Sequence, residues 1–427
     1  MSPMSDRDLP VTLYGIHIGE LARTGGGGTL FRWSDDAEER WGFNSPVLSR
    51  SLRVGFSNVA RTESFFGALL PEGQNLVNLA REVKVASNDL LGILEKVGAD
   101  LAGALRVGSA HEATESENLT GDEVDALLAN ASGFLVGGGG SALPGFQRKL
   151  TLTRGADGTW LRGNGTIPST HILKPVVEDY RTAVENENYT LGLAREVGLL
   201  GFDSWVEKIG RHTVLVIERY DRERDGSSIA RIHQEDGAQA LGLSWGGDAK
   251  FERDDSRSSL RSLAELLDTQ RTVFAPYRPD AEMLLRYTTF NVAAGNTDAH
   301  AKNFSFLHDA NGGTRLAPLY DVTPLALRYD VDRTMAMKVN GVHCQPDITV
   351  DDLVAEAEEW GLPESSSRAI VEELLERLVE ATRQLDADAS IRSHTPGYIR
   401  GQAQNLAAGK PAGIISSEPL MMQKSHP

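Results

Sequence analysis

The amino-acid sequence predicts an α+β protein that folds in more than one domain. Its 427 residues are more than one ordinary hydrophobic core accommodates. Residues 11–22 alternate apolar and polar side chains, and residues 30–33 follow a run of four glycines, which is typical of a β-meander. Helical spacing then extends over residues 64–105. Strands followed by helices predict a first α+β module of about a hundred residues.

Composition and charge exclude several classes of protein. The formal net charge of −17 argues against binding of nucleic acid by the whole surface, because such binding needs Lys and Arg. The one cysteine, Cys344, cannot form an intrachain disulfide, and the N-terminal residues lack the order of a secretory signal. No apolar run reaches the roughly 18 residues that suggest a membrane span. We therefore expect a soluble cytoplasmic protein with no membrane partner.

A polar connector follows the first module. Residues 107–119 are small, polar and acidic, which favours an exposed segment. Thr120 and Glu123 then have the spacing of a capping box at the start of a short helix. A domain boundary is expected near residue 110.

A glycine-rich loop lies within residues 134–153, between two predicted strands. Glycines let backbone N–H groups approach phosphate oxygens closely, and Gln147, Arg148 and Lys149 add possible side-chain donors. The loop is not a G-x-x-x-x-G-K-[ST] motif, however. A plain flexible turn is the commoner explanation of such a run.

Lys174 ends a short apolar strand, and a lysine placed in this way can reach the α and β phosphates of a nucleotide. The commoner alternative is a solvent-facing charge at a strand end. Glu187, in the first turn of a predicted helix, could orient Lys174 or simply interact with the helix dipole. Residues 213–222 predict a buried strand that runs into a charged connector, as the strand before a kinase hinge does.

The most informative stretch is the loop of residues 298–303, Asp-Ala-His-Ala-Lys-Asn, which we call the DAHAKN loop. Asp298 precedes Asn303 by five residues, and Asp321 follows one predicted hairpin later. Protein kinases use this spacing: the first Asp accepts the proton of the substrate hydroxyl, and the Asn and the later Asp hold Mg²⁺. A polar surface hairpin with Asx turns is the alternative for any one of these residues.

The surroundings of this loop fit the same chemistry. Residues 246–259 are a predicted polar loop, residues 260–295 are mainly helical, and residues 304–320 predict a hairpin. His300 could support Asp298 or the phosphates, and Lys302 could neutralise charge on the transferred group. Glycine loop, strand lysine, hinge strand, Asp-to-Asn loop and metal Asp follow one another in kinase order. The sequence therefore predicts a kinase that uses ATP and Mg²⁺.

The chain also resembles the HipA-family serine/threonine kinases, the toxin half of bacterial HipA/HipB toxin–antitoxin pairs. The segments that carry the resemblance run through most of the length: VTLYGIHIGEL, FFGALLPEG, GADLAGAL, GFQRK, HILKP, NENYTLGLAREVGL, ERYDR, RIHQEDGAQALG, GNTDAHAKNFS and APLYDV. The DAHAKN loop is similar to that of phosphatidylinositol-type kinases as well. The resemblance implies a two-lobed protein-kinase-like fold, with an N-terminal subdomain (1–110), an N-lobe (111–220) and a mostly helical C-lobe (221–427) that includes an all-helical C-terminal lobe.

The resemblance assigns roles to individual residues. It makes Asp298 the catalytic base, and Asn303 and Asp321 the ligands of Mg²⁺. The ATP contacts that it implies are Pro144, Gly145, Phe146, Gln147, Arg148, Lys149, Lys174, Glu218, Arg219, Tyr220, His300, Ala301, Lys302, Asn303, Tyr320 and Asp321.

The resemblance also implies partners. These are a HipB-like helix-turn-helix antitoxin, operator DNA only through that antitoxin, and an aminoacyl-tRNA synthetase such as the glutamyl enzyme as the phosphorylated protein. Two other classes of function stay open. A small-molecule kinase of aminoglycoside or lipid type would use the same Asp, Asn and Asp. A non-catalytic scaffold would bind the antitoxin and, through it, operator DNA.

One position departs from the family pattern. HipA relatives autophosphorylate a serine three residues before the loop glycine, and here Ala142 occupies that slot before Gly145. Ser141 lies one position earlier. Either the loop carries an extra residue and Ser141 still serves, or this regulation is absent.

Overall fold

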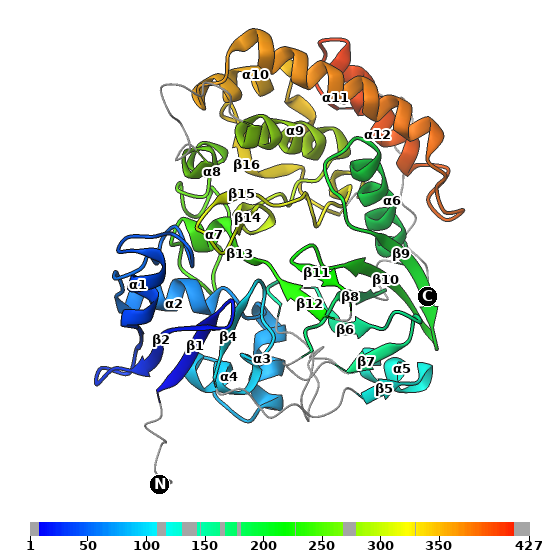
Figure 1. The fold of residues 1–427 in the computed structure, drawn as a ribbon. Coiled ribbons are helices and arrows are strands. Elements are labelled where there is room, and N and C mark those ends of the chain that lie inside the picture. Colours follow the sequence, from blue (N-terminus) through cyan, green and yellow to red (C-terminus); the bar gives the residue numbers. More distant parts are fainter. Residues whose placement is uncertain are drawn as a thin grey trace. The chain divides into compact units, whose positions relative to one another are not determined.

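The structure is a computed structural model that describes residues 8–108, 117–129, 143–145, 147–162, 167–176, 181–226, 228–267, 279–328 and 330–413 (Figure 1). The chain separates into two compact units, and neither is a continuous stretch of sequence. The first unit comprises Met1–Pro175, Glu207–Gly247 and Phe306–Thr314. The second comprises Val176–Val206, Asp248–Ser305 and Arg315–Pro427.

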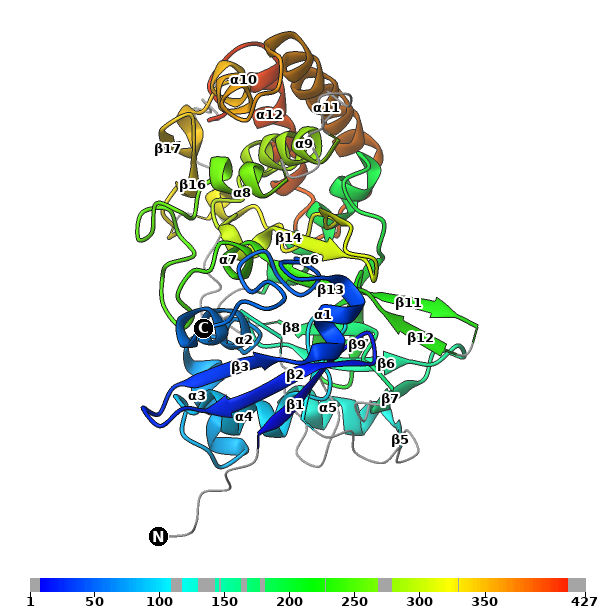
Figure 2. The same cartoon turned by 60° about the vertical axis from the view of Figure 1, so that its left-hand side comes forward.

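The first unit begins with an antiparallel sheet of strand order β3-β2-β1-β4. Strands β3, β2 and β1 lie side by side in Figure 2. Its strands are β1 (Leu9–Leu13), β2 (Ile16–Arg23), β3 (Thr29–Trp33) and β4 (Leu105–Val107). The helices of this region are α1 (Asp35–Trp41), α2 (Val59–Gly67), α3 (Gly73–Glu82) and α4 (Leu90–Val97). Phe31, Phe65 and Phe66 lie fully buried in the core that these elements enclose. The predicted β-meander and the helices after it are confirmed.

A six-stranded sheet of order β5-β7-β6-β8-β10-β9 follows. Its strands are β5 (Glu117–Leu119), β6 (Leu150–Arg154), β7 (Trp160–Arg162), β8 (His171–Pro175), β9 (Ser204–Ile209) and β10 (His212–Glu218). Helix α5 (Gly121–Ala129) begins at the predicted capping box, in which the Thr120 N–H donates to the Glu123 carboxylate at 2.7 Å. Strand β8 lies between β6 and β10, so its backbone is paired on both sides.

The second unit is built mainly from helices. These are α6 (Ala183–Glu196), α8 (Leu260–Leu267), α9 (Pro279–Ala294), α10 (Val350–Glu359), α11 (Glu364–Gln384) and α12 (Thr395–Ala407). Helix α9 is buried along most of its length, and α11 and α12 pack against it. The C-terminal end of α9, where the segment from Gly295 begins, is therefore held in place by packing.

The expected all-helical C-terminal lobe is not confirmed, because strands occur there as well. Strands β16 (Thr334–Val339) and β17 (Val342–Cys344) form an antiparallel pair. They are joined by Asn340 and Gly341, whose φ angles of 49° and 78° suit the mirror-image turn that favours Asn-Gly. The Asn-Gly dipeptide, directly flanked by Val339 and Val342, was a signal of this hairpin in the sequence.

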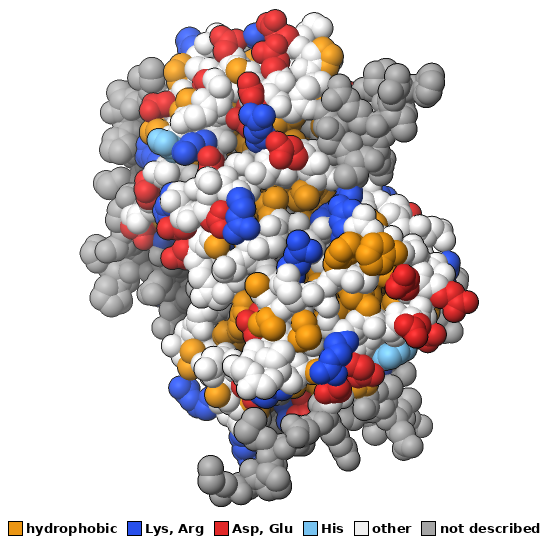
Figure 3. Space-filling model, turned by 90° about the vertical axis from the view of Figure 1, so that its left-hand side faces the viewer, with side chains coloured by type: hydrophobic (Ala, Val, Ile, Leu, Met, Phe, Trp, Pro, Cys, Tyr) orange, Lys and Arg blue, Asp and Glu red, His pale blue; other side chains and the backbone are white. Residues whose placement is uncertain are grey.

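Shorter elements complete the chain. They are β11 (Arg222–Asp225), β12 (Ser228–Arg231), β13 (His233–Asp236), α7 (Gly237–Ala240), β14 (Ser305–His308) and β15 (Thr314–Leu316). Within the described ranges, no helix has both the length and the apolar character that crossing a membrane requires. On the face shown in Figure 3, Lys and Arg side chains are scattered among acidic ones.

Candidate active site

The DAHAKN loop belongs to the second unit and follows helix α9. Gly295 takes the chain out of the helix with φ of +72°, and a Cβ at this position would lie 3.0 Å from the Tyr398 hydroxyl oxygen. The buried Asn296 amide then donates to the side-chain oxygen of Asn291, a residue of the helix, at 2.9 Å. Both features fix the direction in which the loop leaves the helix.

The loop is closed by hydrogen bonds within itself. The Asn303 side-chain amide donates to the backbone carbonyl of Asp298 at 3.0 Å. The His300 N–H donates to the same carbonyl at 2.7 Å, and the Asn303 N–H donates to the His300 carbonyl at 2.8 Å. Asn303 is buried, whereas Asp298 is exposed. The amide nitrogen of Asn303 is used in closing the loop, so its oxygen is the atom that it can offer to a cation.

Two other segments of the second unit hold the loop from outside. The carbonyl of Lys250 accepts from the Ala301 N–H at 3.2 Å and from the Ser258 hydroxyl. The Phe251 ring meets the His300 ring edge-on, with the ring centres 5.3 Å apart. Sequence reasoning interpreted residues 246–259 as a polar loop and missed this support. An aromatic residue within a polar stretch was the signal that it contained a packed segment.

Asp321 lies beyond the hairpin of β14 and β15. The Tyr320 hydroxyl donates to the Lys302 carbonyl at 2.6 Å and lies 2.6 Å from the Ser305 hydroxyl. The end of the hairpin is thereby bonded back to the DAHAKN loop. Asp321 itself is exposed and has a φ of +56°, in the left-handed region that few non-glycine residues adopt. Such backbone conformations concentrate at functional sites.

These residues fit a magnesium ion that is bound together with a nucleotide. Mg²⁺ takes oxygen ligands, commonly one or two carboxylates, and completes its octahedron with waters and phosphate oxygens. Asn303 and Asp321 supply one amide oxygen and one carboxylate. Within the described ranges there is no group of three or more His, Cys, Asp or Glu that could hold a metal by itself. The donor set suits a cation that arrives with phosphates rather than a metal site made of protein alone.

Lys174 and the glycine-loop residues belong to the first unit. Lys174 lies on β8 opposite Leu215 and is only 5 % exposed, so the alternative of a solvent-facing charge is wrong. Gly145 has a φ of +116°, which glycine adopts readily. The Lys149 ammonium donates to the Pro144 carbonyl, and Arg148 donates to the carbonyl of Leu128 at 3.0 Å. Gln147 is partly buried, and Ser141, Ala142 and Phe146 lie outside the described residues.

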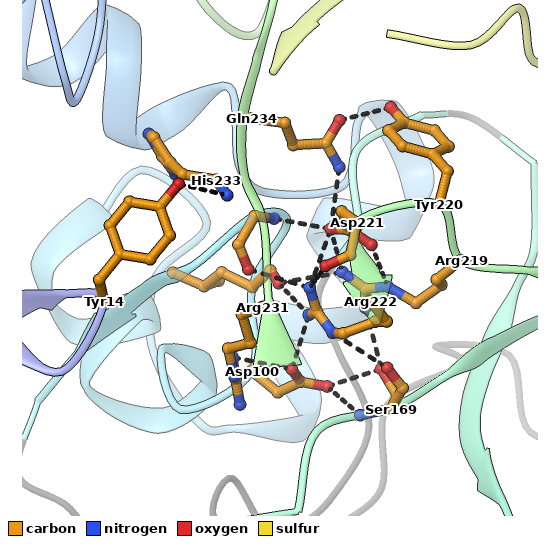
Figure 4. A network of polar contacts seen from close by, with 12 residues as sticks. Tyr14, Asp100, Ser169, Arg219, Tyr220, Asp221, Arg222, Arg231, His233 and Gln234 are labelled. Atoms are coloured by element: carbon orange, nitrogen blue, oxygen red, sulfur yellow. Dashed lines mark hydrogen bonds and ion pairs between the residues drawn. The ribbon is translucent and has the colours of Figure 1, made fainter. Parts of the chain in front are cut away.

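The connection after β10, predicted to be the nucleotide hinge, enters a buried ion-pair network (Figure 4). The Arg219 guanidinium donates to both carboxylate oxygens of Asp221, at 2.9 and 2.8 Å. It also donates to the Ser169 hydroxyl at 2.9 Å and to the Leu101 carbonyl at 3.1 Å. The backbone N–H of Arg219 donates to Thr170 at 2.9 Å. Arg219 is thus fixed by internal bonds, while Glu218 and Tyr220 are partly exposed.

Asp100 extends the network to the loop after α4. Its carboxylate accepts from the Ser169 N–H at 3.0 Å and from the Ser169 hydroxyl at 2.6 Å. It also pairs with Arg222 and Arg231, each at 3.1 Å. Burial alone would raise the pKa of Asp100 and of Asp221, but the neighbouring arginines outweigh it and hold both pKa values below the usual range. Sequence reasoning missed this network, since its members are far apart in the chain.

Two models of known protein families match this chain, each over a different part of the sequence. Residues 141–382, more than half of the chain, match the model of the HipA-like C-terminal domain. Residues 9–108 match the model of the HipA N-terminal domain.

The chain belongs to the HipA family. It is 30 % identical to Y4mE of Sinorhizobium fredii, which bears a provisional kinase name, over 87 % of this chain and 91 % of that protein. It is 27 % identical to the serine/threonine-protein kinase toxin HipA of Shewanella oneidensis, over 85 % of this chain and 86 % of that one. Its fold is similar to that of a chain in the solved complex of HipA, HipB and operator DNA from the Shewanella oneidensis MR-1 toxin antitoxin system. That likeness has a TM-score of 0.77 at 24 % identity and covers 94 % of this chain and 96 % of that chain.

The buried network joins the two HipA domains. Asp100 lies in the part that matches the N-terminal domain, whereas Ser169, Arg219 and Asp221 lie in the part that matches the C-terminal domain. The carboxylate of Asp221 also accepts from the Gly103 N–H at 2.8 Å, which adds a further bond across this junction. Within the first unit, the network therefore joins the N-terminal HipA domain to the part of the C-terminal HipA domain that includes the connection after β10.

Replacing Asp221 by Asn should destabilise the protein strongly. The variant leaves Arg219 and Arg222 buried with one carboxylate fewer, and breaking a buried pair costs about 3–5 kcal/mol. The pKa of Asp221 is depressed in the folded state. The ionised carboxylate therefore adds to the free energy of unfolding above its unfolded pKa of about 4, and this contribution is lost as pH falls below that value. Urea unfolding at several pH values measures both effects.

The matched control for this variant is Asp8→Asn, which removes an exposed ion pair with Arg32 at 2.9 Å. We expect it to change the free energy of unfolding by no more than about 1 kcal/mol. The Asp221→Asn variant should also lose stability less steeply than the wild type between about pH 5 and pH 2. Equal stability of the two variants at neutral pH would contradict the role given to the network.

Proposed function

We propose that this HipA-family chain is an ATP-dependent serine/threonine protein kinase that acts as a toxin. The observation that carries the proposal is the closed DAHAKN loop. Asp298 is exposed at its start, and the Asn303 side chain at its end is hydrogen-bonded to the Asp298 carbonyl. Asp321 follows a hairpin whose end is bonded back to this loop. Phosphoryl transfer depends on positioning and charge stabilisation, and protein kinases use these three residue types in this order.

The chemistry assigned to the loop is a direct phosphoryl transfer. Asp298 accepts the proton of the acceptor hydroxyl while the hydroxyl oxygen bonds to the γ-phosphorus and the bond to the β-phosphate oxygen breaks, which releases ADP. Asn303 and Asp321 would hold Mg²⁺, which supplies neutralisation of phosphate charge when bound. Lys302 and His300, at the same loop, are the other candidates for contacts with the transferred group.

The remaining nucleotide contacts are proposed in the first unit. Lys174 and the backbone around Gly145 would bind the phosphates, and the backbone of Glu218 and Tyr220 would bind the adenine. Lys174 is buried on a central strand, which supports this role, because a buried ammonium group needs charged or polar partners to offset the cost of desolvation. In this proposal the chain divides into an N-terminal subdomain (1–110), an N-lobe (111–220) and a C-lobe (221–427).

The acceptor and the antitoxin are proposed from the family. The Shewanella relative is named a serine/threonine-protein kinase toxin, which favours a protein acceptor over a small molecule. The acceptor that fits the HipA resemblance is an aminoacyl-tRNA synthetase such as the glutamyl enzyme, whose phosphorylation would stop translation and growth in the cytoplasm. The solved relative assembles with HipB and operator DNA, which supports a HipB-like antitoxin here and contact with DNA through it.

Replacing Asp298 by Ala should lower phosphate transfer by at least about a hundredfold, since a positioned general base contributes about 10²–10⁴-fold. The thermal midpoint should not change, because Asp298 is exposed. The assay is incubation of the purified protein with γ-labelled ATP and a cell lysate, followed by identification of the labelled molecule. Asp254→Asn is the control, since Asp254 is an exposed aspartate of the same unit that pairs with Arg253.

The outcomes of this assay separate the three classes of function. A labelled synthetase with wild-type protein and none with Asp298→Ala supports the toxin kinase. Label on a small metabolite supports a small-molecule kinase instead. Growth of cells that express each protein is measured as well. If growth arrest persists with Asp298→Ala and no molecule is labelled by the wild type, the result supports a scaffold and refutes the kinase.

Ser141 is proposed as a site of autophosphorylation in the glycine-rich segment. If Ser141 serves despite Ala142 in the usual slot, wild-type protein incubated with Mg²⁺ and ATP should gain the mass of one phosphate that Ser141→Ala lacks. Intact-mass analysis measures the difference. Equal phosphate on both proteins would show that this residue does not serve.

A further inference from the structure

The hairpin between Asn303 and Asp321 is held by the N-terminal HipA domain. Residues Phe306–Thr314 belong to the first unit, although they lie between these two residues in the sequence. The Tyr14 hydroxyl donates to the carbonyl of His308, which is on β14. The Trp41 indole N–H donates to the carbonyl of Ala310, in the hairpin turn, at 2.9 Å. Two aromatic side chains of one domain therefore hold the backbone of the other domain's hairpin.

Tyr14 is placed for this contact by an unusual backbone. It lies in the turn between β1 and β2 with a φ of +52°, a conformation that costs free energy for a residue other than glycine. Its hydroxyl makes two bonds at once, since it also accepts from the His233 N–H at 3.1 Å. Burial raises the pKa of Tyr14, so the hydroxyl keeps the proton that it donates.

The side chain of His308 fixes the same strand from the other side. Its Nε2 lies 3.0 Å from the Glu235 carboxylate, and its Nδ1 lies 3.1 Å from the Thr314 hydroxyl. His308 and Glu235 are both fully buried. Glu235 in turn accepts from the Arg50 N–H at 2.8 Å. The first unit thus holds β14 by its backbone and by its side chain.

The far end of the hairpin leads directly to the candidate metal ligands. The Ala317 N–H donates to the Ser305 carbonyl at 2.8 Å, which keeps the two strands paired up to their ends. Asn303 lies two residues before β14, and Tyr320 bonds back to the DAHAKN loop. Asn303 and Asp321 therefore flank, along the sequence, a hairpin whose backbone Tyr14 and Trp41 contact at His308 and Ala310.

We propose that Tyr14 and Trp41 are positioning residues for phosphoryl transfer. They hold the hairpin in the position that lets Asn303 and Asp321 bind Mg²⁺ with the nucleotide, although neither touches the reacting atoms. The N-terminal domain then sets the activity of the kinase, and this inference rests on the proposed function. A loosened hairpin should weaken Mg²⁺ use and slow transfer, because a displacement of about 1 Å at a catalytic group can cost about a hundredfold.

The test compares Tyr14→Phe and Trp41→Phe with the wild type. Tyr14→Phe keeps the phenyl ring and Trp41→Phe replaces the indole by a smaller aromatic ring, and each removes the hydrogen bond to the hairpin. The matched control is Trp33→Phe, which removes an indole bond to the Phe56 carbonyl at 3.2 Å within the same domain. Initial rates of transfer are measured over a range of Mg²⁺ concentrations at saturating ATP, and the thermal midpoint is measured for every variant.

We expect Tyr14→Phe and Trp41→Phe to lower kcat about tenfold or more and to raise the Mg²⁺ concentration for half-maximal rate. Trp33→Phe should leave both quantities unchanged. A loss of thermal stability in all three variants, with kcat and the Mg²⁺ requirement unchanged, would overturn the proposal and leave Tyr14 and Trp41 with a packing role.

A second measurement does not depend on enzymatic activity. Amide hydrogen exchange over residues 305–321 should be faster in Tyr14→Phe and Trp41→Phe than in the wild type and in Trp33→Phe. Unchanged exchange in this segment would overturn the inference whether or not the protein transfers phosphate. Absence of transfer by the wild type itself, on any acceptor, would instead count against the proposed function.

Discussion

The hydrogen bond from the Asn303 amide to the Asp298 carbonyl is the interaction on which the candidate site depends. It closes a loop of six residues so that an exposed carboxylate and a buried amide keep a fixed relation along the chain. The bond also fixes the orientation of the Asn303 amide, and so the direction of its oxygen, which is the atom that a cation can bind. The kinase proposal rests on this closure more than on the spacing alone.

The second constraint is that the first unit holds the hairpin that follows the loop. Tyr14, Trp41 and Glu235 contact residues 308–310 from three parts of the first unit. The Asp100–Arg219–Asp221 network then fixes the N-terminal HipA domain to the connection after β10. In both sets, side chains of one family domain bond to backbone groups of the other.

Much of this architecture could be predicted from the sequence, because it follows from local patterns. The alternation of residues 11–22, the capping box at Thr120 and the Asp-to-Asn spacing each involve neighbouring residues, and each of these elements is present in the structure. The Asn340-Gly341 hairpin was local as well and was overlooked. The ion-pair network could not be predicted, since Arg219 and its partner Leu101 are 118 residues apart. Charged residues in a polar-looking connector are expected at the surface, and only the folded chain shows that these are buried. The sequence also carries no local signal that the chain passes back and forth between two compact units.

The most direct test of the account is a crystal structure of the protein with Mg²⁺ and a non-hydrolysable ATP analogue. The account predicts one Mg²⁺ ion within about 2.0–2.1 Å of both the Asn303 amide oxygen and an Asp321 carboxylate oxygen, with phosphate oxygens and waters completing its octahedron. The bond from the Asn303 amide nitrogen to the Asp298 carbonyl should persist in the complex. A cation bound away from either residue, or an Asn303 amide turned so that its nitrogen faces the phosphates, would contradict it.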